Sequence, residues 1–278
     1  MPSTSPWLAV NQATTETSTT RALVAGCVAA GIDGVSLWRH QYVDGSAATT
    51  RQVLDDQGVR ATALCRGGFF TGTRPNAETV ADNEAAVAEA AALGAPVLVL
   101  VCGPVVGTHR SAADEARARI RDGVARLLPV ARTYGVRLAV EPFHPMFLAE
   151  RSAIVTLDQA LDLVEELDDD HLGVAVDTYH VWWDAGLDRA LNRAAGHVLG
   201  LHVADWLVPT PDLLAGRGLP GDGCIDVAGI VAAVRAGGYT GPAEVEVLNP
   251  DVWARDLADL LPDLRDRMAA LDPVAVPA

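Results

Sequence analysis

Short strand-like runs and longer helix-like runs alternate along the whole chain, and this alternation limits the fold more than any other feature. Alternating βαβα patterns of this kind are typical of a parallel sheet whose strands are joined by helices. The strands are expected at residues 7–11, 34–38, 59–65, 96–102, 136–143, 173–177, 198–203 and 243–248. The helices are expected at residues 18–30, before 58, and at 76–93, 112–134, 157–167, from 188, 227–236 and from 251.

Eight strand–helix pairs with no linker-like stretch between them predict an α/β fold, a single (β/α)₈ TIM barrel spanning residues 1–278. An open doubly wound sheet is the competing fold. That fold usually carries a Gly-x-Gly-x-x-Gly motif after its first strand, and the motif is missing here. In TIM barrels the active site lies at the carboxyl ends of the strands. The side chains at those ends are therefore the first candidates for function.

The sixth predicted strand shows the pattern of a barrel wall. Val174 and Val176 alternate with Gly173, Ala175 and Asp177, so the branched side chains share one face and the small residues share the other with a carboxylate. The branched face is expected to pack against helices. Asp177 then stands at the carboxyl end of the strand, with His180 three residues further on.

Three neighbouring strands end in the same way. On the seventh strand, His202 shares a face with Gly200, and on the eighth Glu246 shares a face with Glu244. Glu244 lies about two residues deeper and is expected to pair with an arginine inside the barrel. The four groups expected at the barrel mouth are Glu141, Asp177, His202 and Glu246.

Four such groups would be costly to bury together unless a cation holds them. Taken singly, each has an ordinary structural alternative as a turn residue, a salt-bridge partner or a satisfied core histidine. Taken together, three carboxylates and one imidazole suit a divalent ion. We expect Mn²⁺, with Mg²⁺, Co²⁺ and Zn²⁺ as alternatives.

The motifs around these residues resemble a known family. Residues 139–145 (AVEPFHP), 176–180 (VDTYH), 201–206 (LHVADW) and 245–249 (VEVLN) are similar to the xylose isomerase-like TIM barrel superfamily, and within it to the sugar phosphate isomerase/epimerase family. This family includes ketose 3-epimerases, hydroxypyruvate isomerases and inosose dehydratases. The resemblance implies a metal site at the four residues above. It also implies that His180 and Arg217 bind substrate, although Arg217 has a surface ion pair as its structural alternative.

With that metal site, the two glutamates are the expected acid/base groups. Glu141 or Glu246 would remove the proton next to a ketone, and the same or the other glutamate would return it. Arg66 and His144 follow the third and fifth strands and are further candidates for substrate contact. The aromatic residues that follow strand ends could form a hydrophobic rim, with loop packing as the alternative, which we favour for Trp38; they are Trp38, Phe69, Phe70, Trp182 and Trp183.

Composition excludes several other chemistries. All 21 basic residues are arginine, so Schiff-base chemistry that needs a lysine is excluded. The formal net charge of −15 makes nucleic acid an unfavourable partner. No stretch has the length of a membrane span, no signal peptide is recognisable, and the four cysteines are widely spaced, so we expect a cytoplasmic protein with reduced thiols and no membrane partner.

The predicted function is a metal-dependent isomerase or epimerase acting on a ketose or related polyol ketone. A lyase or dehydratase using the same enolate chemistry is the main alternative, and nothing in the sequence decides between them. An endonuclease IV-type nuclease would need further histidine ligands, and a non-catalytic sugar-binding barrel would not need the acid/base set. A homo-oligomer is compatible with the sequence, which does not decide the oligomeric state.

Overall fold

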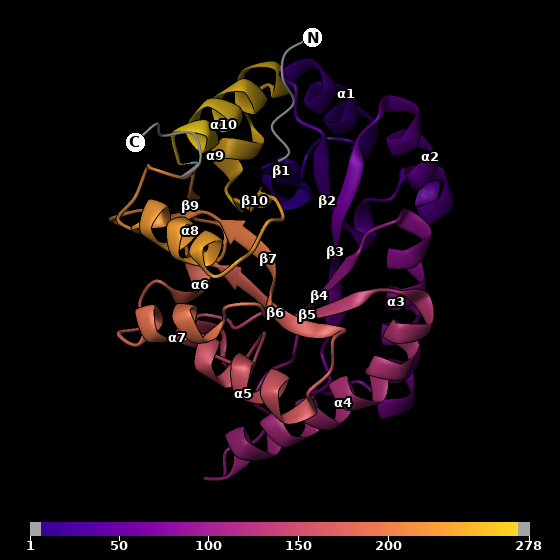
Figure 1. Ribbon diagram of the computed structural model, residues 1–278, viewed down its shortest axis with the longest axis vertical. Helices are drawn as coiled ribbons and strands as arrows, with labels where there is room; N and C mark the ends of the chain where they lie inside the picture. Colours follow the sequence, from indigo (N-terminus) through magenta and orange to yellow (C-terminus); the bar gives the residue numbers. More distant parts are fainter. Residues whose placement is uncertain (1–6, 272–278) are drawn as a thin grey trace.

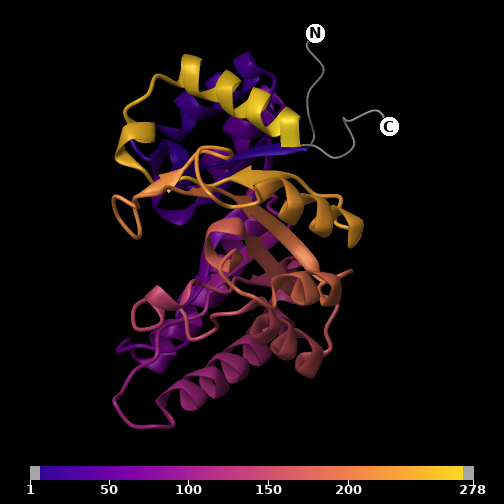
Figure 2. The same cartoon turned by 90° about the vertical axis from the view of Figure 1, so that its left-hand side faces the viewer.

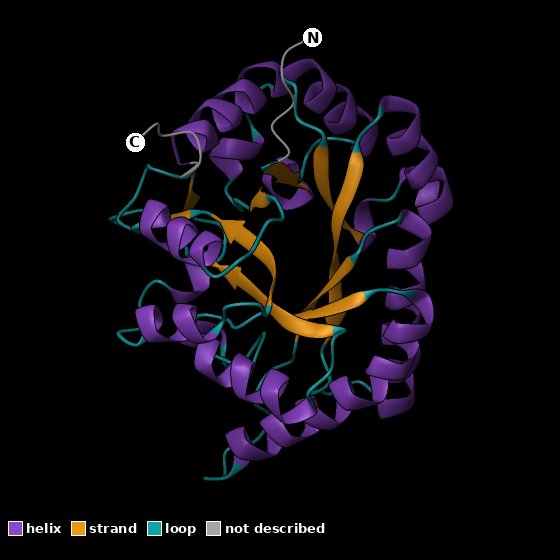
Figure 3. Cartoon of the chain, viewed as in Figure 1, coloured by secondary structure: helices purple, strands orange, loops and turns teal. Residues whose placement is uncertain are grey.

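Residues 7–271 are described by the computed structural model, and within them eight parallel strands close into a barrel (Figures 1 and 3). The strands are hydrogen-bonded in the order β1-β10-β7-β6-β5-β4-β3-β2, and β2 pairs back to β1. The predicted (β/α)₈ TIM barrel is confirmed. The strands are β1 (Leu8–Asn11), β2 (Gly34–Trp38), β3 (Arg60–Gly68), β4 (Val97–Val101), β5 (Arg137–Val140), β6 (Leu172–Asp177), β7 (Val198–Val203) and β10 (Ala243–Val245).

Helices surround the barrel, and the first and last long helices, α1 and α10, lie side by side where the barrel closes (Figures 1 and 2). Within the described residues, no helix has the length and apolar character needed to cross a membrane. The helices are α1 (Thr20–Ala30), α2 (Ala47–Gln57), α3 (Asn76–Leu93), α4 (Ala112–Tyr134), α5 (Leu157–Leu167), α6 (Thr178–Val181), α7 (Leu187–Arg193), α8 (Val227–Ala236), α9 (Pro250–Trp253) and α10 (Leu257–Leu271), with short 3₁₀ turns at Gln12–Thr15, Arg39–Gln41, Val43–Gly45 and Pro145–Phe147.

On β6, side-chain size separates the two faces of the barrel wall. The large apolar cluster between strands and helices includes Val174 and Val176 of β6 and Leu201 of β7. A second, smaller cluster on the opposite face includes Ala175 of β6, with Ala63 and Ala139 and the valines Val97 and Val99 from neighbouring strands. The alternation predicted for β6 is therefore confirmed, with branched residues packed against helices and a small residue on the opposite face. Small residues leave room inside the barrel for larger polar side chains.

Local capping signals explain several helix boundaries. Gly94 ends α3 in the left-handed conformation with φ of 71°, and the Asp226 carboxylate caps α8 by accepting from Gly229 N. Thr156 caps α5 by accepting from Gln159 N at 3.2 Å. Asn76 is the first residue of α3, and Pro75 occupies the capping position.

Two segments differ from the sequence-based expectation, and both lie near the barrel mouth. The third strand was predicted to end at residue 65, yet β3 continues to Gly68. Its register against β4 shifts between Cys65 and Gly67, so Arg66 occupies a bulge. The long segment after β7 contains two short antiparallel strands, β8 (Asp205–Trp206) and β9 (Arg217–Gly218). Neither feature has a periodic hydrophobic pattern that would reveal it.

Candidate active site

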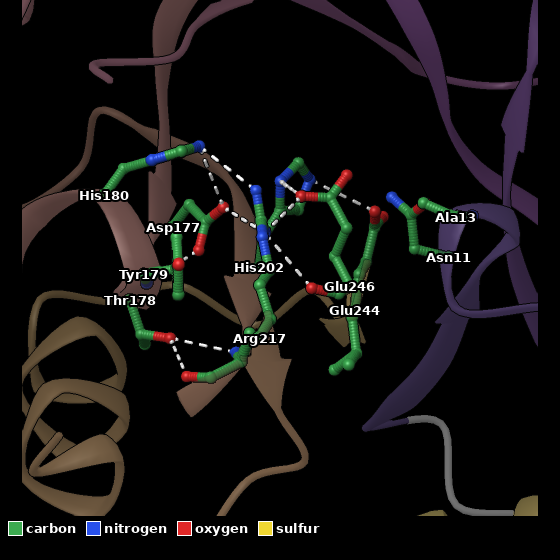
Figure 4. Close-up of polar contacts among 12 residues, drawn as sticks. Asn11, Ala13, Asp177, Thr178, Tyr179, His180, His202, Arg217, Glu244 and Glu246 are labelled. Carbon is green, nitrogen blue, oxygen red and sulfur yellow. Dashed lines mark hydrogen bonds and ion pairs between the residues drawn. The ribbon is translucent and has the colours of Figure 1, made fainter. Parts of the chain in front are cut away.

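The structure brings the four predicted residues together at the carboxyl ends of neighbouring strands. Glu141 follows β5, Asp177 ends β6 and His202 lies near the end of β7. Glu246 follows β10. Each offers one ligand atom, and these atoms all lie within 4.8 Å of one another. All four side chains are buried, and Figure 4 shows Asp177, His202 and Glu246 converging on one point of the barrel interior.

His202 lies between carboxylates on both sides of its ring. Its Nδ1 is 2.8 Å from Glu141 Oε1, and its Nε2 is 3.3 Å from Glu244 Oε2. Burial lowers the pKa of His202, but the charges of Glu246 and Glu141 outweigh it and hold that pKa well above its ordinary value. Burial also raises the pKa of Glu141, and the hydrogen bond from His202 only partly opposes this. Without a bound cation, these carboxylates therefore favour the protonated imidazole.

Glu244 does not pair with an arginine as expected; it contacts His202. The two residues are direct neighbours in the register of β10 and β7, so their side chains extend from adjacent strands into the same barrel interior. Burial raises the pKa of Glu244, but the 3.3 Å contact with His202 and the charge of that ring bring it below its ordinary value. A carboxylate on the outer nitrogen of a metal-binding histidine fixes the ring and its tautomer. Glu244 is placed to do this for His202.

Arg217 is buried inside this cluster, so the surface ion pair considered for it is wrong. Its Nη1 donates to Asp177 Oδ2 at 2.9 Å and to Glu246 Oε2 at 3.0 Å (Figure 4). The guanidinium also lies over the ring of Tyr179, 4.6 Å from its centroid. These contacts hold two of the four clustered carboxylates in fixed positions.

The β8–β9 segment places Arg217 through buried side-chain contacts. The Asp205 carboxylate accepts hydrogen bonds from the backbone N–H groups of Trp206, Gly221 and Ile225, which ties the two ends of the segment together. Asn249, which follows β10, donates from Nδ2 to the carbonyl of Arg217 at 2.8 Å. Neither role was recognised in the sequence, because an Asp or Asn in a loop is common without such a function.

Neither of the two histidines predicted to contact substrate is in the wall of the cavity beside this cluster. His180 Nε2 is 3.2 Å from Arg217 Nη2, and its ring stacks on Phe143 at 4.2 Å. Burial lowers the pKa of His180 to about 3, so this ring is neutral. His144 stacks on Trp206, and its Nδ1 accepts from Met146 N.

A cavity of about 150 Å³ opens beside the cluster. Its wall contains Glu141, Glu246 and Arg217, together with Arg66 from the predicted set. Trp38, for which loop packing was favoured, lines it as well and donates from Nε1 to Asn11 Oδ1 at 2.7 Å. The wall also contains residues that were not recognised in the sequence, namely Cys65, Val101, Phe143, Arg151, Leu214 and Leu248.

The charges in the cluster fit a divalent cation. Four buried carboxylates face one arginine and one imidazole, so negative charge exceeds positive charge by two even when His202 is protonated. Buried charge of this kind is stable only when compensated. Glu141, Asp177, His202 and Glu246 are the residues that would hold the ion, since one oxygen or nitrogen of each reaches the common point.

Fold and site together define a TIM barrel with a buried carboxylate–imidazole centre at the carboxyl ends of its strands. The chain belongs to the xylose isomerase-like TIM barrel family, whose model matches residues 24–264. The chain is 31% identical over 233 residues to a 3-dehydroshikimate dehydratase of Pseudomonas aeruginosa, covering 80% of this chain and 35% of that protein. The chain thus spans about a third of that relative's length.

Two further similarities are informative. An inosose isomerase of Bacillus subtilis is 25% identical over 164 residues, which are 56% of each chain. The crystal structure of protein SMc04130 from Sinorhizobium meliloti 1021 superposes with a TM-score of 0.90 and 39% identity over 95% of this chain and 98% of the other. The relatives are therefore enzymes of more than one reaction type on this fold.

Replacing Glu244 tests its contact with His202. We expect Glu244→Gln to weaken Mn²⁺ affinity by about 10-fold, within the roughly 10–100-fold range seen for such supporting groups. The measurement is calorimetric titration of the metal-free protein. Glu150→Gln makes the same chemical change on an exposed side chain and is expected to bind Mn²⁺ as the unaltered protein does. Equal affinity in all three proteins would show that Glu244 does not support the site.

Proposed function

We propose that the chain is a divalent-metal-dependent enzyme that removes the proton next to the carbonyl of a polyhydroxylated ketone, and that it acts as a sugar isomerase or epimerase. The observation that carries this proposal is the buried cluster of Glu141, Asp177, His202 and Glu246 beside the cavity. Its hard oxygen donors favour Mn²⁺, with Mg²⁺, Co²⁺ and Zn²⁺ as alternatives. When bound, the ion supplies positive charge opposite the oxygen that becomes negative as the proton leaves.

Glu141 and Glu246 are the proposed acid/base groups. Each has one oxygen held by the protein, since Glu141 Oε1 contacts His202 and Glu246 Oε2 contacts Arg217. Among the described residues, no side chain or backbone group hydrogen-bonds to Glu141 Oε2 or Glu246 Oε1. Each glutamate thus combines a fixed orientation with one oxygen that can take or return a proton. Return on the opposite face gives an epimer, and return at the neighbouring carbon gives an isomer.

The remaining side chains are proposed to place the substrate. Arg66 and Arg217 are in the cavity wall, where their N–H groups can donate to substrate oxygens. His180 contacts Arg217, and the His144 backbone N–H donates to His180 Nδ1 at 3.4 Å, so both are proposed to act on the binding site through Arg217. The apolar part of the wall, with Phe143 and Leu248, excludes water and strengthens the electrostatic contacts.

Dehydration is the second candidate, favoured by the 31% identity to a dehydratase over 80% of this chain. The same glutamate would take the proton next to the ketone. The bond between the β-carbon and its hydroxyl oxygen would then break, and the hydroxyl would leave with a proton as water while a carbon–carbon double bond forms. The acid/base groups are shared, so only the fate of the β-hydroxyl separates the two reactions.

One experiment tests both reactions. Protein loaded with Mn²⁺ is incubated in D₂O with scyllo-inosose, L-ribulose 5-phosphate or 3-dehydroshikimate, and the masses of the products are measured by mass spectrometry. Incorporation of deuterium without loss of water supports isomerisation or epimerisation, and loss of water supports dehydration. If none of these ketones exchanges a proton or loses water faster than in buffer with Mn²⁺ alone, proton abstraction from such ketones is the wrong function.

A further inference from the structure

Two arginines in the cavity wall have no carboxylate partner in a chain where acidic residues outnumber basic ones by 36 to 21. Among the described residues, Arg66 and Arg151 form no ion pair. Four other arginines without an ion pair are exposed, namely Arg110, Arg119, Arg126 and Arg137. Arg66 and Arg151 differ from these because both are half-buried and both line the cavity that contains Glu141 and Glu246.

The backbone holds each of these arginines in place. Arg66 lies in the bulge between β3 and β4, a feature that redirects a side chain. The neighbouring Gly68 has φ of 105°, and a Cβ there would lie 2.1 Å from Val101 O, so this turn requires glycine. Arg151 lies on a segment tied to Gly103 after β4, because Gly103 N donates to Arg151 O and Ala153 N donates to Gly103 O, each at 2.8 Å.

Both arginines bring a positive charge to the wall of one cavity. Burial lowers the pKa of Arg66, and the charge of Arg151 lowers it further. The face of the Arg66 guanidinium is covered by the Phe69 ring, 4.4 Å from its centroid, so its N–H edge is left for other contacts. Two like charges held at one cavity wall are stabilised when an anion lies between them.

We propose that Arg66 and Arg151 form an anion-binding subsite of the active cavity, and that the substrate is a hydroxylated ketone carrying a carboxylate. This inference rests on the proposed function and names its substrate class. A guanidinium offers two parallel N–H donors that match the two oxygens of a carboxylate. Glu141 and Glu246 are in the same cavity wall, so the acid would be held by its carboxylate while its ketone faces the glutamates.

The chemistry of the wall favours a carboxylate over a phosphate. Phosphate sites commonly use a row of backbone N–H groups at a helix N-terminus or glycine-rich loop, often with a lysine. The cavity wall contains no lysine, and the apolar residues Trp38, Phe143, Leu214 and Leu248 line it together with the arginines. Two guanidinium groups beside apolar side chains suit the carboxylate of a cyclic or linear organic acid.

Binding and turnover are measured separately to test this. Calorimetry of the Mn²⁺-loaded protein compares 3-dehydroshikimate, which carries a carboxylate, with neutral scyllo-inosose and with L-ribulose 5-phosphate. The acid is expected to bind tightest. Arg66→Gln and Arg151→Gln should each weaken its binding by about 10–100-fold, as expected for one charge-assisted hydrogen-bonded contact, and should weaken inosose binding far less. Arg66→Lys and Arg151→Lys keep the positive charge but not the paired N–H donors of the guanidinium, so each should weaken binding of the acid by an intermediate amount.

Arg137→Gln removes an exposed arginine at the start of β5, the opposite end of the barrel, and serves as the matched control with unchanged affinity. Equal affinity for the acid in the unaltered protein and in both Gln variants would overturn the subsite. Tighter binding of the phosphate with the same arginine dependence would overturn the carboxylate assignment. A protein that binds the acid through both arginines but neither exchanges its proton nor releases water would contradict the proposed function and leave the subsite standing.

Discussion

Glu141→Gln and Glu246→Gln are each expected to lower the rate of substrate proton exchange by about 10²–10⁴-fold, the usual contribution of a positioned acid/base group. Glutamine keeps the length of the side chain and an oxygen that can face a cation, but it cannot take a proton at neutral pH. Much of the Mn²⁺ affinity should therefore survive. The measurement is deuterium incorporation into the ketone under single-turnover conditions, with Mn²⁺ binding followed in parallel.

Asp177→Asn is the matched comparison. Asp177 is proposed to hold the ion without transferring a proton, and its carboxylate accepts hydrogen bonds from Arg217 Nη1 and from Tyr179 N. This variant should lose Mn²⁺ affinity, and exchange should recover as Mn²⁺ is raised. If both glutamine variants exchange protons at the unaltered rate, the glutamates only hold metal, and the base lies elsewhere.

Removing the metal is expected to abolish activity. Loss of a cation at the developing negative oxygen removes several kcal/mol of stabilisation, so exchange should fall by about 10³-fold or more after treatment with EDTA and desalting. Mn²⁺ or Co²⁺ should restore it. Because the ion binds the folded chain, Mn²⁺ at 100 times its dissociation constant should add about 2.7 kcal/mol to the free energy of unfolding, seen as a higher melting temperature. Full activity in protein verified as metal-free would contradict the site.

The barrel could be predicted from sequence because its signal is repeated. Eight strands with branched residues on one face leave few other ways to bury them, and Val174 and Val176 lie where the alternation requires. The bulge at Arg66 and the β8–β9 pair could not be predicted. They depend on register against neighbouring strands and on contacts such as Asp205 with Ile225 N, which join residues 20 positions apart.

The candidate site, too, could be predicted from the sequence only in part. The position of Glu141, Asp177, His202 and Glu246 at the carboxyl ends of consecutive strands predicted that they lie together, because consecutive parallel strands end at the same edge of the barrel. The partner of Glu244 was predicted wrongly. The alternation of side chains along a strand predicts which face Glu244 occupies, but not which side chain of the neighbouring strand it contacts. Arg151 was missed because its position depends on the pairing of residue 152 with Gly103, far from any strand pattern.

The most direct test of the metal centre is a crystal structure of the protein soaked with Mn²⁺, with anomalous diffraction measured near the manganese edge. The expected result is one strong anomalous peak inside the barrel, about 2.0–2.4 Å from oxygen or nitrogen atoms of Glu141, Asp177, His202 and Glu246. The contradicting result is a Mn²⁺-soaked crystal with no peak among these four residues, while Arg217 still bridges Asp177 and Glu246 and His202 still lies between its carboxylates.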